Sequence, residues 1–290
     1  MKNKILSAFT IILAVLYPLS FLLEKKSNQI KTYETAFLNP KNINSVQKIK
    51  ISDTECDLYL LNKNGIWSGN VSSSDKEMIF SAEQQTVKNF IKNLSSIKKL
   101  YLSSSNSKIL NDSNWNFKIS YTLQNGIETE ILIGKTDISK SKRFIKLPSE
   151  KKIYKTDANF EPFLTTDANF WVCPNLFTAP DGNEITEEKI QRITFVHQGK
   201  KTVLIPGTEN FSEKAEKLLS LRHGKLSDDV FSRIMSDTIE IETEDNKFTR
   251  IKIQPKDEDF LVQYEIDGKF YTAEISLWTY NKIIEIFSRP

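Results

Sequence analysis

Residues 117–133, FKISYTLQNGIETEILI, contain the clearest strand and turn signals in the chain. Two runs rich in β-branched and aromatic residues, 117–123 and 128–133, flank Gln124-Asn125-Gly126. Asn-Gly between two such runs predicts a β-hairpin closed by a two-residue turn, because both residues tolerate the positive φ of that turn. The stretch therefore predicts two adjacent antiparallel strands.

The same alternation of short strands and turns extends through the first half of the chain. Further strands are expected at residues 46–51, 56–61, 143–147 and 152–155. Asn64-Gly65, just ahead of Trp67, is a second turn signal of the Asn-Gly kind. The first half therefore reads as a meander of antiparallel strands.

One helix is expected to interrupt these strands. Apolar side chains change to spacings of three or four between residues 81 and 102, at Val87, Phe90, Ile91, Leu94 and Ile97. Ser81 followed by Gln84 matches a capping box. We expect an amphipathic helix over residues 81–102 and a short helix over residues 157–164.

The second half repeats this layout. A hairpin through Gly199 is expected first, then a helix, four strands and a closing helix, at residues 192–197, 202–205, 211–221, 238–243, 249–253, 260–266, 269–275 and 277–287. Asp267-Gly268 predicts another hairpin turn. Each half thus reads as two strands, a helix, four strands and a short helix.

Sequential hairpins with one helix between them exclude a doubly wound parallel sheet, because parallel crossovers need a helix after nearly every strand. We expect an α+β fold, in which an N-terminal transmembrane helix is followed by two similar antiparallel sheet-plus-helix modules. The expected parts are an anchor (1–26), a stalk (27–45), a first module (46–165), a linker (166–185) and a second module (186–290).

The anchor is expected at residues 5–23, an uncharged run that follows Lys2 and Lys4. As a helix it would measure roughly 28 Å, close to the thickness of the hydrocarbon core of a bilayer. A cleaved signal peptide is the alternative, although the end of the run offers no small-x-small cleavage site. The flanking lysines favour neither side of the membrane. We expect a cytoplasmic N-terminus, with the body outside the cytoplasm, because long domains translocate largely regardless of charge.

The composition is that of a folded globular protein, and its charges nearly cancel, so no strong electrostatic field is expected. The chain has 290 residues, and its 40 basic and 37 acidic side chains leave a net charge of +3. Nucleic acid is therefore not expected as a partner. Cys56 and Cys173 could form one disulfide in an exported body or remain separate thiols.

The sequence contains few residues that are expected to be catalytic. The two histidines, His197 and His223, lie in different elements, and neither metal-ligand spacings nor a glycine-rich phosphate loop occurs. We expect no enzymatic activity, no cofactor and no metal. The carboxylates of Glu240, Glu242 and Glu244 are expected on the solvent face of a strand, with a weak calcium site as the alternative.

Aromatic residues are the remaining candidates for a binding surface. Trp171, Phe170, Phe177 and Trp115 could line an aromatic groove for sugars or peptides, near the cleft between the modules. Such side chains more often form the core of a sheet-and-helix protein. Both interpretations stay open from the sequence.

Several short motifs carry a family resemblance. They are Gly65-Ile66-Trp67, Ile133-Gly134-Lys135, Arg143-Phe144-Ile145-Lys146, and Lys152-Ile153-Tyr154-Lys155-Thr156 ahead of Phe160 and Phe163-Leu164. Over about residues 46–177 the chain resembles the bacterial domain of unknown function 4340 family (DUF4340), with a weaker fit beyond. The resemblance implies one N-terminal membrane segment and an extracytoplasmic body, often an accessory component encoded with gliding-type ABC exporters. It supplies no catalytic residues.

The leading hypothesis is a non-enzymatic, membrane-anchored accessory or scaffold protein of an envelope complex, associated with an ABC transporter in the cytoplasmic membrane. The alternative is an extracytoplasmic ligand-binding module that takes a sugar, lipid or peptide in the cleft between the modules. A hydrolase would require a pair of acidic residues converging in a cleft.

Overall fold

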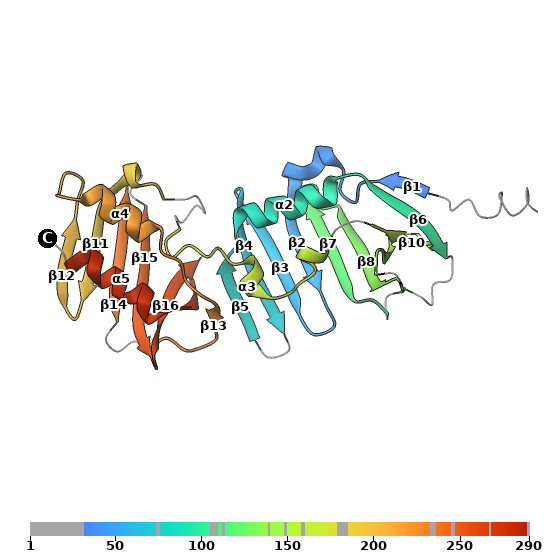
Figure 1. Cartoon of the computed structure of the whole chain (residues 1–290). Coiled ribbons are helices and arrows are strands. Elements are labelled where there is room, and N and C mark those ends of the chain that lie inside the picture. Colours follow the sequence, from blue (N-terminus) through green and yellow to red (C-terminus); the bar gives the residue numbers. More distant parts are fainter. Residues whose placement is uncertain are drawn as a thin grey trace, which may run out of the picture.

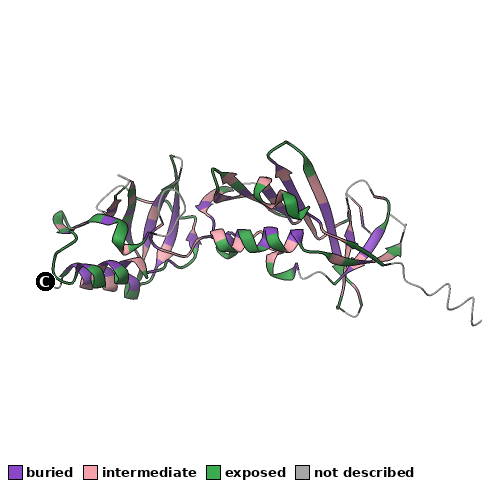
Figure 2. Cartoon of the chain, turned by 90° about the horizontal axis from the view of Figure 1, so that it is seen from above, coloured by how far each residue is buried: buried purple, intermediate pink, exposed green. Residues whose placement is uncertain are grey.

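The computed structural model describes residues 32–73, 76–104, 110–111, 114–138, 140–147, 150–157, 160–178, 185–232, 236–244, 247–266 and 268–288. These residues form two antiparallel β-sheets that follow one another along an elongated molecule (Figure 1). Seen from above in Figure 2, the helices α2 and α5 lie along the same side of the sheets. The fold is therefore α+β and mostly β.

The first sheet has, within the described residues, ten strands in the order β1-β6-β10-β9-β8-β7-β2-β3-β4-β5. Their bounds are β1 Thr32–Thr35, β2 Val46–Ser52, β3 Asp57–Lys63, β4 Ile66–Ser73, β5 Lys76–Ser81, β6 Lys98–Ser104, β7 Phe117–Leu123, β8 Glu128–Thr136, β9 Arg143–Lys146 and β10 Ile153–Thr156. Helix α2 (Gln84–Ser95) crosses one face of this sheet (Figure 1). Its apolar stripe, which includes Val87, Phe90 and Leu94, is buried against the sheet.

The helix predicted over residues 81–102 is too long. α2 ends at Ser95, Ile97 is 71% exposed, and the chain then enters β6, where Leu100 is buried. The predicted capping box is also wrong, because the helix is capped by the Glu83 carboxylate, which accepts from the backbone N–H of Gln85. The Gln84 amide instead donates to and accepts from the backbone of Trp67, on β4. This side chain therefore fastens the helix to the sheet.

The second sheet has, in the part of the chain described, seven strands in the order β12-β11-β14-β15-β16-β17-β13. Their bounds are β11 Ile190–His197, β12 Lys200–Leu204, β13 Leu226–Ser227, β14 Asp237–Thr243, β15 Phe248–Lys256, β16 Asp259–Ile266 and β17 Lys269–Ile275. Helices α4 (Phe211–Leu219) and α5 (Leu277–Ser288) lie in front of this sheet in Figure 1. The predicted order of hairpin, helix, four strands and helix is confirmed here, with β13 added.

The first half does not repeat that order, because β4 and β5 precede α2 and β6 follows it. The sequence pattern does not predict β4, because Gly69 occupies a position where a bulky apolar residue would indicate a strand. The Phe80 ring fills that space: a Cβ placed on Gly69 would lie 2.1 Å from Phe80 Cζ. The short helix predicted over residues 157–164 is a 3₁₀ turn, η2 (Glu161–Phe163).

The predicted turns differ in type. Asn64 and Gly65 both have positive φ, 57° and 89°, and close a two-residue hairpin between β3 and β4. The β7–β8 turn is one residue longer than expected, because Leu123 N–H donates to Ile127 O and Gly126 N–H donates to Leu123 O, both at 2.9 Å. In this fully described turn Gly126 alone has a positive φ, of 80°. The connection is therefore a three-residue loop.

The N-terminal segment lies mostly outside the description. Residues 1–31, which include the predicted anchor at 5–23, are not among the described residues, and no helix of the described part is long and apolar enough to cross a membrane. The described part of the predicted stalk belongs to the fold. β1 pairs with β6, η1 (Pro40–Ser45) follows, and Phe37 and Leu38 are buried between them.

One continuous cluster of buried apolar side chains runs through both sheets. The described part of the predicted linker contributes to it through helix α3 (Ala168–Trp171) and through Leu176 and Phe177. The connection between the sheets is therefore packed into the core rather than extended across solvent.

Candidate functional site

The two sheets meet beside the outer edge of β5. On the first-sheet side, Cys173 N–H donates to Ser81 O (2.8 Å) and Glu83 N–H donates to Trp171 O (2.7 Å). These bonds surround an antiparallel bridge between Ala82 and Val172. The connecting segment therefore extends the edge of the first sheet by a short piece of strand.

The same segment is bonded to the second sheet. Leu176 N–H donates to Leu221 O (2.9 Å), and His223 N–H donates to Pro174 O (3.0 Å). Gly224 N–H then donates to the carbonyl oxygen of Glu274 on β17 (2.7 Å). We call residues 171–176 together with 221–227 the seam. It connects the sheets through main-chain hydrogen bonds.

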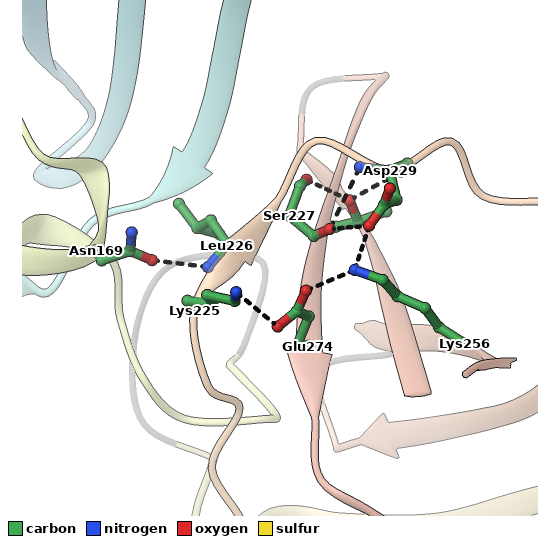
Figure 3. A network of polar contacts seen from close by, with 8 residues as sticks. Asn169, Lys225, Leu226, Ser227, Asp229, Lys256 and Glu274 are labelled. Atoms are coloured by element: carbon green, nitrogen blue, oxygen red, sulfur yellow. Dashed lines mark hydrogen bonds and ion pairs between the residues drawn. The ribbon is translucent and has the colours of Figure 1, made fainter. Parts of the chain in front are cut away.

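Trp171 anchors the seam. Its side chain is fully buried, its ring centroid lies 5.6 Å from that of Phe90 on α2, and its indole N–H donates to Thr165 O (3.0 Å). Burial of so large an aromatic side chain is worth about 3 kcal/mol. Next to it, the side-chain oxygen of Asn169 accepts from Leu226 N–H at 2.7 Å, across the two halves (Figure 3).

A charge network flanks the seam on the second sheet (Figure 3). The Lys256 ammonium lies between the Asp229 carboxylate and Glu274 Oε1, the latter at 2.7 Å, and Lys225 lies 3.4 Å from Glu274. The hydrogen bonds from Lys256 lower the pKa of both carboxyl groups, and the same bonds raise the pKa of Lys256. The network fixes the loop after β13 to β15 and β17.

An open cavity lies between β5 and the loop after β13, and we call it the junction groove. Its volume is about 470 Å³. It is lined by Glu77, Met78, Ile79, Ser227, Asp228, Asp229, Val230, Phe231, Gln263, Phe270, Tyr271 and Thr272. Val230 is 90% exposed and Phe270 57% exposed, so apolar side chains stand in solvent at its rim.

A second cavity, of about 530 Å³, lies under the segment that leads into α3. It is lined by Asp53, Cys56, Val71, Met78, Phe117, Leu164, Thr165, Thr166, Asp167, Ala168, Asn169, Leu226 and Asp228. Met78 and Asp228 line both cavities, which are therefore neighbours. Both volumes are in the range of ligand sites.

The four aromatic residues predicted as a binding surface do not lie on one surface. Trp171 and Phe177 are buried in the main core, and Phe170, which is 40% exposed, packs against the Trp171 ring. Trp115 packs instead on a separate small cluster around Leu132. A role for Phe170 in binding stays a prediction.

The structure brings together polar groups that the sequence did not connect. His197 Nδ1 lies 2.9 Å from Asp237 Oδ2, which also accepts from the Tyr280 hydroxyl of α5 at 2.6 Å. The sequence separation of the three residues concealed this cluster. His223 is buried in the seam, where its Nδ1 and Nε2 lie 2.8 and 2.7 Å from the carbonyl oxygens of Gly224 and Cys173.

The glutamates of strand β14 form ion pairs. Glu240 bonds to Arg250, and Glu242 lies 2.6 Å from Arg192 on the neighbouring strand. Among the described residues, no group of three or more His, Cys, Asp and Glu side chains is placed to hold a metal ion.

The two cysteines are free thiols. Cys56 lines the second cavity, and Cys173 lies in the seam. Burial raises the pKa of the Cys173 thiol to about 11.

Comparison with known families shows the family of this chain. The model of a domain of unknown function, DUF4340, matches residues 74–259, more than half of the sequence. The chain belongs to the DUF4340 family. The DUF4340 match begins later than the resemblance expected from residue 46 and continues beyond residue 177 into the second sheet, so it contains β5, the seam and the loop after β13. No curated protein matches the chain.

Proposed function

We propose that this DUF4340 protein is a non-enzymatic, membrane-anchored scaffold whose extracytoplasmic body binds a segment of another envelope protein in the junction groove. The observation that carries the proposal is the groove itself, where exposed Val230 and Phe270 stand beside carboxylates on a main-chain framework. Exposed apolar side chains with a polar rim are typical of protein-binding surfaces. The seam supports this role because it holds the two walls of the groove in register.

The location and the partner class rest on the sequence. The uncharged run at residues 5–23 supports a single span in the cytoplasmic membrane, and the resemblance to exporter accessory components supports an ABC transporter subunit as partner. In intact cells, a protease outside the cytoplasmic membrane should degrade the body. Degradation only from the cytosolic side would contradict this topology.

The absence of an enzymatic role is also a proposal. The His197–Asp237 pair resembles a base and its orienting carboxylate, but its third partner is the Tyr280 hydroxyl, which donates to Asp237 and holds α5 on the sheet. No serine or cysteine hydrogen-bonded to this pair is seen in the described residues. We assign the pair to packing of α5.

Site-specific photo-crosslinking tests the binding role. A photoreactive residue at Val230, in the groove, is compared with one at Ile138, which is also almost fully exposed, on the loop after β8. In gently solubilised membranes, position 230 should crosslink to a transporter permease subunit and position 138 should not. Crosslinking that is absent, or equal at both positions, would contradict the proposal.

A second candidate function is favoured by the second cavity. Its volume of about 530 Å³, with carboxylates of Asp53 and Asp167 beside apolar Val71 and Leu164, suits a small ligand such as a sugar, lipid or peptide. Native mass spectrometry of the full chain with such compounds would separate the two candidates, since a small-ligand protein would retain one of them and show no groove crosslink.

A further inference from the structure

The outer edge of β5 is only partly occupied. β5 pairs with β4 in a regular antiparallel register that places Ser68 opposite Ser81, Asn70 opposite Ile79 and Ser72 opposite Glu77. In such a register, alternate residues direct both their N–H and C=O groups away from the partner strand. The outward groups of β5 therefore belong to every second residue.

The hydrogen bonds around Ser81 identify which β5 residues direct their main-chain groups outward. Its carbonyl oxygen accepts from Cys173 N–H in the seam, whereas the N–H of the next residue, Ala82, donates back to Trp67 O on β4 (3.2 Å). Both main-chain groups of Ser81 thus point away from β4. By the two-residue period, the N–H and C=O groups of Ile79 and Glu77 point the same way, toward the groove that they line.

The seam fills this edge only at its Ser81 end. Beyond the Ala82–Val172 bridge, no backbone hydrogen bond from outside β4 reaches Ile79 or Glu77 in the described part of the chain. An unpaired strand edge inside a groove is a template for a further strand. The protein's own segment already demonstrates strand addition at the adjacent position.

We propose that the junction groove binds an extended peptide segment of a partner, which adds to the edge of β5 opposite Glu77 and Ile79 and continues the pairing begun by the seam. This assignment rests on the proposed partner-binding function and names the form of the bound segment. Apolar side chains of the segment pack on Phe270 and Val230.

The charge of the groove selects the segment. Glu77, Asp228 and Asp229 line it, and no lysine or arginine is among its lining residues in the described chain. Lys269 pairs with Glu77 and Lys256 with Asp229, and neither lysine is among the lining residues. The segment therefore alternates apolar with basic side chains.

Peptide binding to the full chain in mild detergent tests the proposal by fluorescence anisotropy. The probe is labelled Val-Lys-Val-Lys-Val, with Val-Glu-Val-Glu-Val and a version N-methylated at alternate residues as controls. The lysine peptide should bind, and each control should bind at least about tenfold more weakly, the loss expected from one or two hydrogen bonds or an adverse charge pattern. Equal binding of either control, or no binding of the lysine peptide, overturns the proposal.

Variants at Ile79 isolate the strand edge. Ile79→Pro removes the outward N–H and is compatible with an edge strand, whereas Ile79→Thr keeps the N–H and changes only the side chain. Proline should reduce lysine-peptide binding at least about tenfold and threonine less than about threefold, with unchanged thermal unfolding for both. Equal binding by both variants overturns strand addition.

Two further results separate this inference from the proposed function. If Val230 crosslinks to a partner as strongly in the Ile79→Pro protein as in wild type, the groove remains a partner site and strand addition is wrong. If the wild type forms a dimer that Ile79→Pro dissociates, the occupant is a second copy and the peptide assignment is wrong. If the Val230 crosslink is present in wild type and lost in the Ile79→Pro protein, the result supports both the partner site and strand addition.

Discussion

Replacing Trp171 by alanine removes the side chain that anchors the seam. The ring is fully buried and lies 5.6, 6.2 and 5.0 Å, centroid to centroid, from the rings of Phe90, Phe163 and Phe170. Its indole N–H also satisfies the carbonyl oxygen of Thr165 at 3.0 Å. The substitution therefore leaves a cavity and an unpaired acceptor at the same place.

The expected loss of unfolding free energy is about 3–5 kcal/mol, the range for truncating a buried Trp or Phe to alanine. With a urea dependence of about 3 kcal/mol per molar for a chain of this size, the midpoint should fall by about 1 to 1.7 M. Loss of the hydrogen bond to Thr165 places the effect toward the upper end of the range.

The assay is urea unfolding of the full chain in mild detergent, followed by far-UV circular dichroism. Trp278→Ala is the matched control, because Trp278 is 65% exposed on α5 and its ring contacts the Lys282 ammonium only at 5.7 Å. This control should lose no more than about 0.5 to 1 kcal/mol. Small and equal losses in both variants would refute the role given to Trp171.

Three further predictions concern the same framework. Gly69→Ala should cost about 1–3 kcal/mol in thermal or urea unfolding, because its Cβ would lie 2.1 Å from Phe80 Cζ, and Phe80→Leu in the same chain should recover part of the loss. Burial lowers the pKa of His223 below 6.5, so the contribution of the neutral imidazole to stability is full above about pH 6.5 and is lost as the pH falls. His223→Gln should therefore reduce the change of the unfolding midpoint between about pH 7 and about pH 5. An unchanged pH dependence in this variant would contradict the role given to His223. Asp237→Asn should weaken the attachment of α5 by about 1–3 kcal/mol, since the Tyr280 hydroxyl donates to that carboxylate at 2.6 Å, and faster amide exchange in α5 is the measurement.

Sequence patterns predict well those strands in which apolar and polar residues alternate without interruption. β7 coincides with the predicted strand, and the second sheet follows the predicted order, since its strands alternate apolar and polar residues between clear turns. β4 is not predicted because Gly69 interrupts the apolar face of that strand. The end of α2 was missed because Ile97 continues the helical spacing while its side chain faces solvent.

The site depends on contacts between residues distant in sequence, which a pattern of neighbours does not contain. The sequence allows Trp171 to be either a core residue or a groove residue, and its packing against Phe90 of α2 places it in the core. The groove forms because β5 and the loop after β13 meet, although they are separated by most of the matched family region. The outward direction of Ile79 follows from the β4–β5 register and from the bond between Ser81 O and Cys173 N–H.

Amide hydrogen exchange along β5 reports directly on strand addition at this edge. The full chain is compared with and without the Val-Lys-Val-Lys-Val peptide, and exchange is read at the amides of Glu77 and Ile79, which line the groove. Strand addition predicts that these two amides become protected when the peptide is bound, with no change at the Met78 amide, which already faces β4. Unchanged exchange at Glu77 and Ile79 with the peptide bound would show that the peptide does not pair with β5.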